Sequence, residues 1–309
     1  MNNNLKNTVL KYKSLIGLLI LCIVISFITP RFLSIANIKN VLTQVSVNAV
    51  IAIGMSFVIL TGGIDLSVGS ILAVSGAAAA SIIKSTGNLF LAIIAALAIG
   101  SVIGLINGVL ISKGRIQAFI VTLATMTIFR GVTYVYTNGT PISGLGQSFS
   151  SIGNKTFLGL PIPVLLMVIV FGIGFYVLSQ TRYGRYLYAL GGNEDSARLS
   201  GINTSKIKTL VYVICGATAA LSGIIVTSRI GSASPNAGVG FELDAIAAVV
   251  LGGTSLAGGE GSVVGTIIGA LIIGVLNNGL NLMNVSPFYQ AIVKGLVILL
   301  AVMVEKKNK

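Results

Sequence analysis

Long apolar windows separated by short polar pieces run along almost the whole sequence. A helix needs about 20 apolar residues to cross the ~30 Å hydrocarbon core of a bilayer, because each residue adds about 1.5 Å. The pattern predicts an all-α polytopic membrane protein with about ten transmembrane helices, in which residues 1–309 form a single transmembrane domain. The predicted spans are roughly 15–29, 41–60, 66–83, 89–111, 116–136, 163–178, 210–228, 243–256, 263–282 and 288–304.

Composition excludes several classes of protein. Only 9% of the residues are charged, far below the ~25% of soluble domains, and the mean hydropathy is +0.98. The chain has no His, and Cys22 and Cys215 both lie in apolar windows, so we expect no catalytic residues, no metal site and no cofactor. The net charge of +13 comes from basic residues at the ends of windows, which indicates membrane topology rather than nucleic-acid binding.

The distribution of Lys and Arg predicts the orientation, because cytoplasmic loops carry the excess of positive charge. With ten spans and both termini cytoplasmic, only Arg31, Lys39, Lys84, Lys155 and Arg229 lie outside. Arg130 and Lys294 lie within spans, where we expect their long stems to snorkel. The predicted cytoplasmic set is Lys6, Lys11, Lys13, Lys113, Arg115, Arg182, Arg185, Arg198, Lys206, Lys208, Lys306, Lys307 and Lys309.

The longest polar interval, 181–208, carries the signals of a short helix outside the membrane. A Gly-Gly pair ends the preceding helix, and Asn193 is an N-cap residue. Glu194 and Asp195 then occupy the first turn, where acids favour the helix dipole, and Gly201 ends the piece. The sequence predicts a cytoplasmic helix of about two turns.

Two glycine-rich breaks, LTGGIDLSVGS at 60–70 and VLGGTSLAGGEGS at 250–262, interrupt the apolar pattern. Their similarity hints at a weak internal duplication. Each break is either a tight turn between spans or a helix break facing a translocation path. Asp65 is predicted to cap a helix start, whereas Glu242 and Glu260 are expected at solvated helix ends. The candidate path residues in the breaks are Asp65, Ser67, Gly252 and Gly253.

Amide side chains form a second polar signal within the spans. Asn277 and Asn278 lie together in the ninth span, and Asn48 lies in the second. Amides facing lipid are costly, so these side chains are expected to point into the bundle. They either make interhelical hydrogen bonds or line a path for a polyhydroxylated solute.

The chain has no G-x-x-x-x-G-K-[ST] sequence, so it lacks a Walker A loop for nucleotide phosphates. Uphill transport would need an ion gradient or a separate ATPase. The chain also lacks a series of acids and histidines suited to a proton relay, which favours the separate ATPase.

Three stretches carry a family resemblance. TRYGRYLYALGGNEDSARLSGI from Thr181, LTGGIDLSVGS from Leu60 and FELDAIAAVVLGGTSLAGGEGS from Phe241 resemble signatures of the permease subunits of ribose-type ABC sugar importers, in the family order. The resemblance implies a bacterial inner-membrane protein in two copies, or paired with a related chain, surrounded by membrane lipid. It also implies an ATP-binding cassette ATPase and an extracellular or periplasmic solute-binding protein as partners.

The resemblance further implies that the polar interval couples ATP hydrolysis to transport. The residues that would couple to the ATPase are Gly192, Asn193, Glu194, Ala197, Arg198 and Gly201.

Two alternatives remain open. The outer loop 137–161 is either a plain connector or a surface for the extracellular partner. The alternative function is that of a stand-alone secondary transporter or channel that uses the breaks around Asp65 and Gly252.

Overall fold

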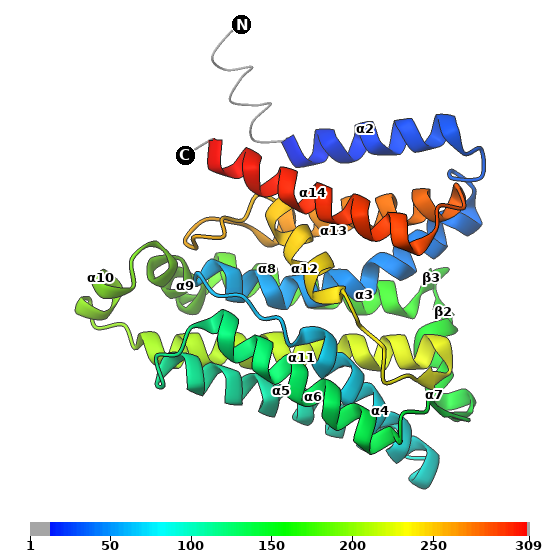
Figure 1. Cartoon of the computed structure of the whole chain (residues 1–309), viewed down its shortest axis with the longest axis horizontal. Coiled ribbons are helices and arrows are strands. Elements are labelled where there is room, and N and C mark those ends of the chain that lie inside the picture. Colours follow the sequence, from blue (N-terminus) through cyan, green and yellow to red (C-terminus); the bar gives the residue numbers. More distant parts are fainter. Residues whose placement is uncertain (1–12, 308–309) are drawn as a thin grey trace, which may run out of the picture.

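The computed structural model describes residues 13–307 and shows a bundle of roughly parallel and antiparallel helices (Figure 1). Each predicted span corresponds to one apolar helix. Lys6, Lys11 and Lys309, which the orientation argument used, lie outside the described residues. The ten apolar helices are α2 Lys13–Ile28, α3 Ile35–Leu60, α4 Val68–Thr86, α5 Leu89–Ser112, α6 Ala118–Thr137, α8 Ile162–Gln180, α11 Thr204–Ile230, α12 Phe241–Leu251, α13 Val263–Leu282 and α14 Pro287–Lys307.

Helix length separates these ten helices into two groups. Seven of them, namely α3, α4, α5, α6, α8, α11 and α13, are long and apolar enough to cross a membrane. The apolar parts of α2 and α14 are shorter, at Ser14–Ile28 and Pro287–Leu300. Helix α12 has 11 residues, so at about 1.5 Å per residue it reaches only about half of the bilayer core.

Helices α3 and α11 form the centre of the bundle. From Val45 to Leu60 every residue of α3 except Asn48 is buried. Helix α11 packs mainly against α5, α3 and α4. Close approach to α5 depends on glycine, because a Cβ on Gly100 would strike the carbonyl oxygen of Gly216.

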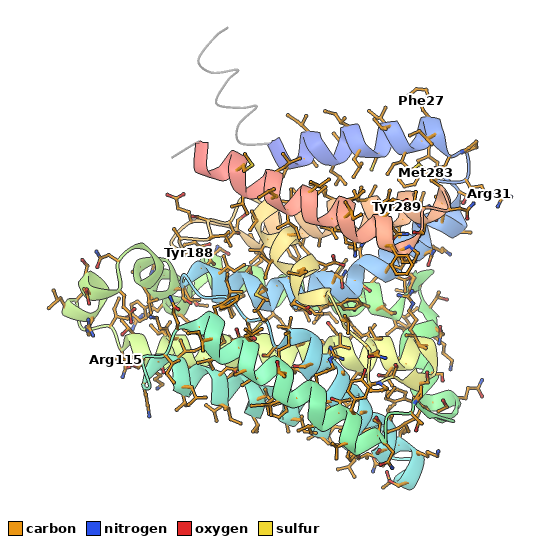
Figure 2. The ribbon with its side chains drawn as sticks, viewed as in Figure 1. Phe27, Arg31, Arg115, Tyr188, Met283 and Tyr289 are labelled. Carbon is orange, nitrogen blue, oxygen red and sulfur yellow. The ribbon has the colours of Figure 1, made fainter. Side chains whose placement is uncertain are left out.

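The outer helices present large apolar side chains to the surroundings. Phe27 of α2 is 88% exposed and Phe288 of α14 is 83% exposed. Figure 2 shows Phe27 pointing away from the bundle. Helices α5, α6 and α8 expose further Leu, Ile and Phe side chains. Such extensive apolar surface fits contact with lipid and establishes, with the long apolar helices, an all-α polytopic membrane protein.

Helices α4 and α12 both begin inside the molecule. After α3, residues 61–67 turn back from the end near α9 toward the middle, where α4 starts; residues 231–240 enter from the other end and lead into α12 (Figure 1). The first turn of α4 meets the segment 231–240 where a Cβ on Gly69 would strike the carbonyl oxygen of Gly238. Glycine is therefore required at this contact.

One end of the molecule carries α9 Arg182–Gly192 and α10 Glu194–Leu199, and we call it the α10 end. The first residues of α2 and the last residues of α14 lie at this same end (Figure 1). Figure 2 places Arg115 and Tyr188 there as well, and Arg31, Met283 and Tyr289 at the opposite end.

The opposite end, which we call the hairpin end, is covered by the loop predicted at 137–161. Strand β1 Ile142–Ser143 pairs antiparallel with β4 Ser232–Ala233, and β2 Thr156–Phe157 pairs with β3 Leu160–Pro161. Helix α7 Gly146–Asn154 lies between them and is tied to α11, since Ser228 Oγ accepts from Gly153 N at 2.7 Å. The loop is an ordered cap rather than an irregular connector.

Candidate functional site

The predicted helix in the polar interval is present as α10. Asn193 Oδ1 accepts a hydrogen bond from Ser196 N at 2.8 Å, which caps the helix start. Gly201 follows the helix with φ of +81°, a left-handed conformation that glycine adopts without strain. The local signals in the sequence therefore place both ends of this helix.

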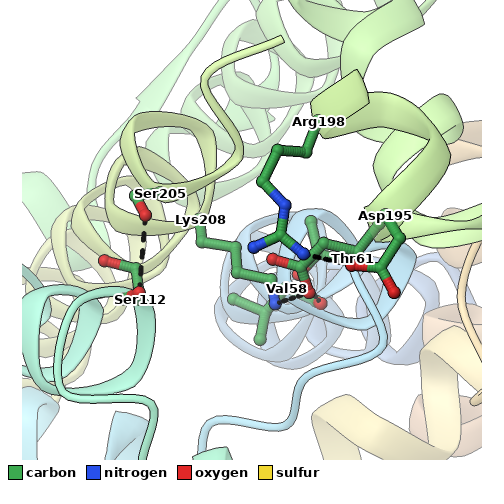
Figure 3. A network of polar contacts seen from close by, with 8 residues as sticks. Val58, Thr61, Ser112, Asp195, Arg198, Ser205 and Lys208 are labelled. Carbon is green, nitrogen blue, oxygen red and sulfur yellow. Dashed lines mark hydrogen bonds and ion pairs between the residues drawn. The ribbon is translucent and has the colours of Figure 1, made fainter. Parts of the chain in front are cut away.

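Two ion pairs hold the charges of α10 (Figure 3). Arg198 pairs with Asp195 on the same helix, where both side chains are more than half exposed, so this pair adds little stability. Glu194 pairs with Lys208 of α11, whose side chain is only 21% exposed. The second pair therefore ties α10 to a helix of the central bundle.

The two faces of α10 differ. Ala197 is 4% exposed and faces the bundle, whereas the next but one residue, Leu199, is 88% exposed. A large apolar side chain at the tip of a polar segment suits contact with another protein. Sequence reasoning missed Leu199, although an apolar residue between Arg198 and Ser200 was a usable signal.

The three stretches that carry the family resemblance meet next to α10. Gly259 N of the second break donates to Leu60 O at the first break at 3.0 Å, and Tyr188 Oη of α9 donates to Gly261 O at 2.9 Å. A Cβ on Gly191 would strike Leu60 O. The end of α9 therefore contacts both glycine-rich breaks directly.

Two tyrosines fix α9 against its neighbours. Burial raises the pKa of the Tyr183 phenol, and it also raises the pKa of the Tyr188 phenol. Both phenols therefore stay protonated near neutral pH. Tyr183 Oη donates to Ile207 O of α11 at 3.4 Å, and Tyr188 reaches the second break.

A large cavity, the α10 cavity, opens between α10 and the bundle. Its volume is about 750 Å³. It is bounded by the turn after α3, the link between α5 and α6, α10 and the start of α11. Its lining residues include Thr61, Gly62, Gly63, Arg115, Asn193, Glu194, Arg198, Lys208 and Tyr212.

Asp65 is fully buried at the interior start of α4. Its Oδ1 accepts from Ser67 N at 2.9 Å and from Ser67 Oγ at 2.6 Å. Asn107 Nδ2 of α5 donates to Ser67 Oγ at 2.9 Å. Among the described residues no ion pair involves Asp65. The geometry makes Asp65 a support for the turn that leads into α4.

A second cavity, the amide cavity, lies between α3, α11, α12, α13 and α14. Its volume is about 330 Å³. Its lining residues are Gln44, Val47, Asn48, Val226, Arg229, Ile230, Phe241, Asp244, Gly274, Asn277, Asn281, Gln290 and Lys294. Five of these thirteen side chains are amides, so the wall is rich in groups that both donate and accept hydrogen bonds.

An ion pair forms one wall of the amide cavity. Lys294 Nζ of α14 donates to Asp244 Oδ2 of α12 at 3.0 Å, and the Asp244 side chain is 5% exposed. Asn48 Nδ2 of α3 donates to the same carboxylate oxygen at 3.3 Å. The pair therefore joins the first turn of α12 to α14 and α3.

The structure separates the predicted path residues. Asn48 and Asn277 both line the amide cavity. Asn278 instead exchanges two hydrogen bonds with Asn37 of α3, at 2.9 and 3.0 Å, outside the cavity lining. Asp65 and Ser67 are buried just before α4, while Gly252 and Gly253 directly follow α12, where Gly252 packs against Gly265.

Two basic residues differ from their expected snorkelling positions. Arg130 of α6 donates through Nη1 to Pro235 O at 2.7 Å and to Ala237 O at 2.8 Å. It therefore holds the segment that leads into α12. Lys294 pairs with Asp244, as described above. Sequence reasoning missed both contacts because the partners are 50 or more residues away and nothing local marks them.

Glu260 in the second break and Glu242 at the start of α12 have unequal surroundings. Glu260 is exposed, as expected of a solvated position. Glu242 lies in the first turn of α12 inside the molecule, is only partly exposed, and accepts from Gly240 N through Oε1 at 3.2 Å.

Comparison with known proteins decides the family. The family described as "Branched-chain amino acid transport system / permease component" matches residues 37–302. The chain belongs to this family. Its members are membrane permease components of transport systems, so a chain of this family is a transport subunit and implies an ATPase and a binding protein as partners.

Several curated relatives align over nearly their whole length. The ribose import permease protein of Escherichia coli is 57% identical over 308 residues, which is 98% of this chain and 96% of the relative. That of Bacillus subtilis is 56% identical over 295 residues, 95% of this chain and 92% of the relative. The L-arabinose transport system permease protein of Escherichia coli is 38% identical, with 96% and 90% covered. No solved structure matches.

Proposed function

We propose that the chain is the membrane-spanning permease subunit of an ATP-binding-cassette importer for ribose or a similar monosaccharide, in a bacterial inner membrane. The observation that carries the proposal is the 57% identity to a ribose import permease over 98% of the chain. The relatives named for allose and arabinose are 40% and 38% identical. Ribose is therefore the first solute to test.

The proposed orientation puts the α10 end in the cytoplasm. The basic residues of α9, α10 and the start of α11 gather there, with both ends of the described chain at the same end (Figure 1). The chain then crosses the membrane ten times as one permease domain. The eighth crossing combines the non-helical segment 231–240, which consists mostly of turns, with the short helix α12.

In this orientation α10 is the contact for a separate ATPase. Its Leu199 and Arg198 are exposed, with Arg198 on the wall of the α10 cavity, and Ala197 packs inward. Movement of α10 is transmitted through α9 to both glycine-rich breaks, since Gly191 and Tyr188 touch them. The ends of α3 and α12 would then shift together, which suits rigid-body gating.

The opposite end suits the other partner. The hairpin end carries the ordered cap of α7 with its two short sheets, and we propose that a sugar-loaded extracellular or periplasmic binding protein docks there. A second permease copy or a related chain completes the membrane unit, with lipid around the exposed apolar helices.

Reconstitution tests the proposal. The purified chain, its ATPase and its binding protein are placed in liposomes, and uptake of radiolabelled ribose is measured with and without ATP. We expect uptake only when all three proteins and ATP are present. Equal uptake by the chain alone would contradict the proposal and would favour the stand-alone transporter or channel.

A further inference from the structure

We propose that the amide cavity is a binding site for one neutral, polyhydroxylated ring, occupied by the solute on its way through the membrane. This inference rests on the proposed function and adds a site to it. The cavity's ~330 Å³ is at the small end of the range of about 300–1,000 Å³ for ligand pockets, which suits a single monosaccharide ring.

The lining offers hydrogen bonds that the protein itself does not use. The amide oxygens of Asn48 and Asn277 are buried, and neither has a hydrogen-bond partner among the described residues. Both residues line the cavity from different helices, α3 and α13. A buried acceptor without a partner is costly, so a ligand that donates to it gains affinity.

Hydroxyl groups fit this wall better than other ligand chemistry. An amide donates through nitrogen and accepts through oxygen, and a hydroxyl does both as well. Gln44, Asn281 and Gln290 add three further amides to the wall. A ring with several hydroxyls can therefore satisfy several amides at once, from more than one helix.

The ion pair in the wall argues against a zwitterionic ligand. Asp244 and Lys294 neutralise each other at 3.0 Å, and Asn48 donates to the same carboxylate. Arg229 also lines the cavity and makes no ion pair among the described residues. The ammonium group of a zwitterionic amino acid would have to compete with Lys294 for the Asp244 carboxylate. A neutral polyol leaves the pair intact and can also donate to the carboxylate.

The cavity lies on the route expected of the solute. It is lined by the first turn of α12, which begins inside the molecule, and by Gln290 near the start of α14 at the hairpin end. In the proposed orientation that end faces the binding protein. The solute would reach this site before it reaches the α10 cavity.

Saturation-transfer NMR with ribose tests the site, because the method detects weak binding. The permease–ATPase complex without binding protein is compared as wild type and as Asn277→Ala, and each is also tested for ATP-driven uptake in liposomes with saturating loaded binding protein. We expect transfer to ribose protons in the wild type, a loss of most of that signal in Asn277→Ala, and about tenfold slower uptake, the factor that corresponds to about 1.4 kcal/mol.

Asn37→Ala is the matched control. It also removes an amide at a helix contact, since Asn37 bonds Asn278 and donates to Phe32 O, but it does not line the cavity. We expect it to keep the wild-type NMR signal. Equal signals in wild type and Asn277→Ala, no wild-type signal with ribose, or a stronger signal with leucine than with ribose would overturn the inference. These results leave the proposed function intact if ATP-driven ribose uptake persists, whereas a wild type without any sugar uptake overturns both.

Discussion

Helices α4 and α12 both begin inside the molecule next to an acidic residue, yet the two acids are held in different ways. Asp65, before α4, is fully buried and is held by the backbone and hydroxyl of Ser67. Asp244, in the first turn of α12, pairs with Lys294 and lines a cavity. The first arrangement is a buried cluster around one turn, which Asn107 of α5 joins through Ser67, while the second joins α12, α3 and α14 around a cavity.

This difference between the two acids indicates which of the two helix starts can respond to a ligand. Asp65 bonds to Ser67 two positions away, and Asn107 of α5 bonds to Ser67 in turn, so this buried cluster fixes one turn against the bundle. Asp244 connects α12 with α3 and α14, so a change at this carboxylate alters how three helices meet. We therefore assign Asp65 to support of the turn and Asp244 to the solute route.

The largest effect is expected from breaking the Asp244 pair. Asp244→Leu leaves Lys294 without its counter-charge in a site where its side chain is 28% exposed, which should cost about 3 kcal/mol of unfolding free energy. SDS-titration unfolding of the detergent-solubilised chain measures this cost. The double variant Asp244→Leu with Lys294→Met should regain most of it. A double variant as unstable as the single one would contradict the ion-pair account.

A smaller loss of stability is expected at Asp65, and two substitutions there test whether its charge matters. Asp65→Leu removes the acceptor for two donors of Ser67 and should cost about 1–3 kcal/mol in the same assay. Asp65→Asn keeps an acceptor oxygen at the same position and should lose much less. If Asp65→Asn loses as much unfolding free energy as Asp65→Leu, the charge of Asp65 matters. The contrast between Asp65 and Asp244 would then be wrong.

The sequence predicts what depends on local pattern. All ten apolar windows became helices because apolar length is a property of neighbouring residues. The start and end of α10 were also predictable, since Asn193 and Gly201 act within a few positions. The family resemblance was also predictable, because it depends on three short stretches and on their order along the chain.

Contacts between distant segments were not predictable in the same way. The predicted span 243–256 extends into the second break, but α12 ends at Leu251 because two glycines follow and Gly252 packs against α13. Asn277 and Asn278 look equivalent in sequence. One step of about 100° around α13 turns the first toward the amide cavity and the second toward Asn37.

The similarity of the two glycine-rich breaks shows the same limit. Both contain Gly-Gly, a short polar piece and Gly-Ser, yet the first turns back into the molecule and buries Asp65. The second links α12 to α13 and exposes Glu260. What they share is their contact with each other through Gly259 and Leu60, beside α9.

The measurement that tests the account most directly follows ribose uptake and ATP hydrolysis together in the reconstituted complex, for wild type and for Glu194→Ala with Arg198→Ala. The matched control is Glu260→Ala with Lys206→Ala, which removes the same charges from exposed positions at the same end. The account predicts that the α10 variant inserts normally and loses uptake, with ATP hydrolysis no longer linked to it, while the control transports as wild type does. Normal uptake by the α10 variant would contradict the claim that a separate ATPase drives this permease through α10.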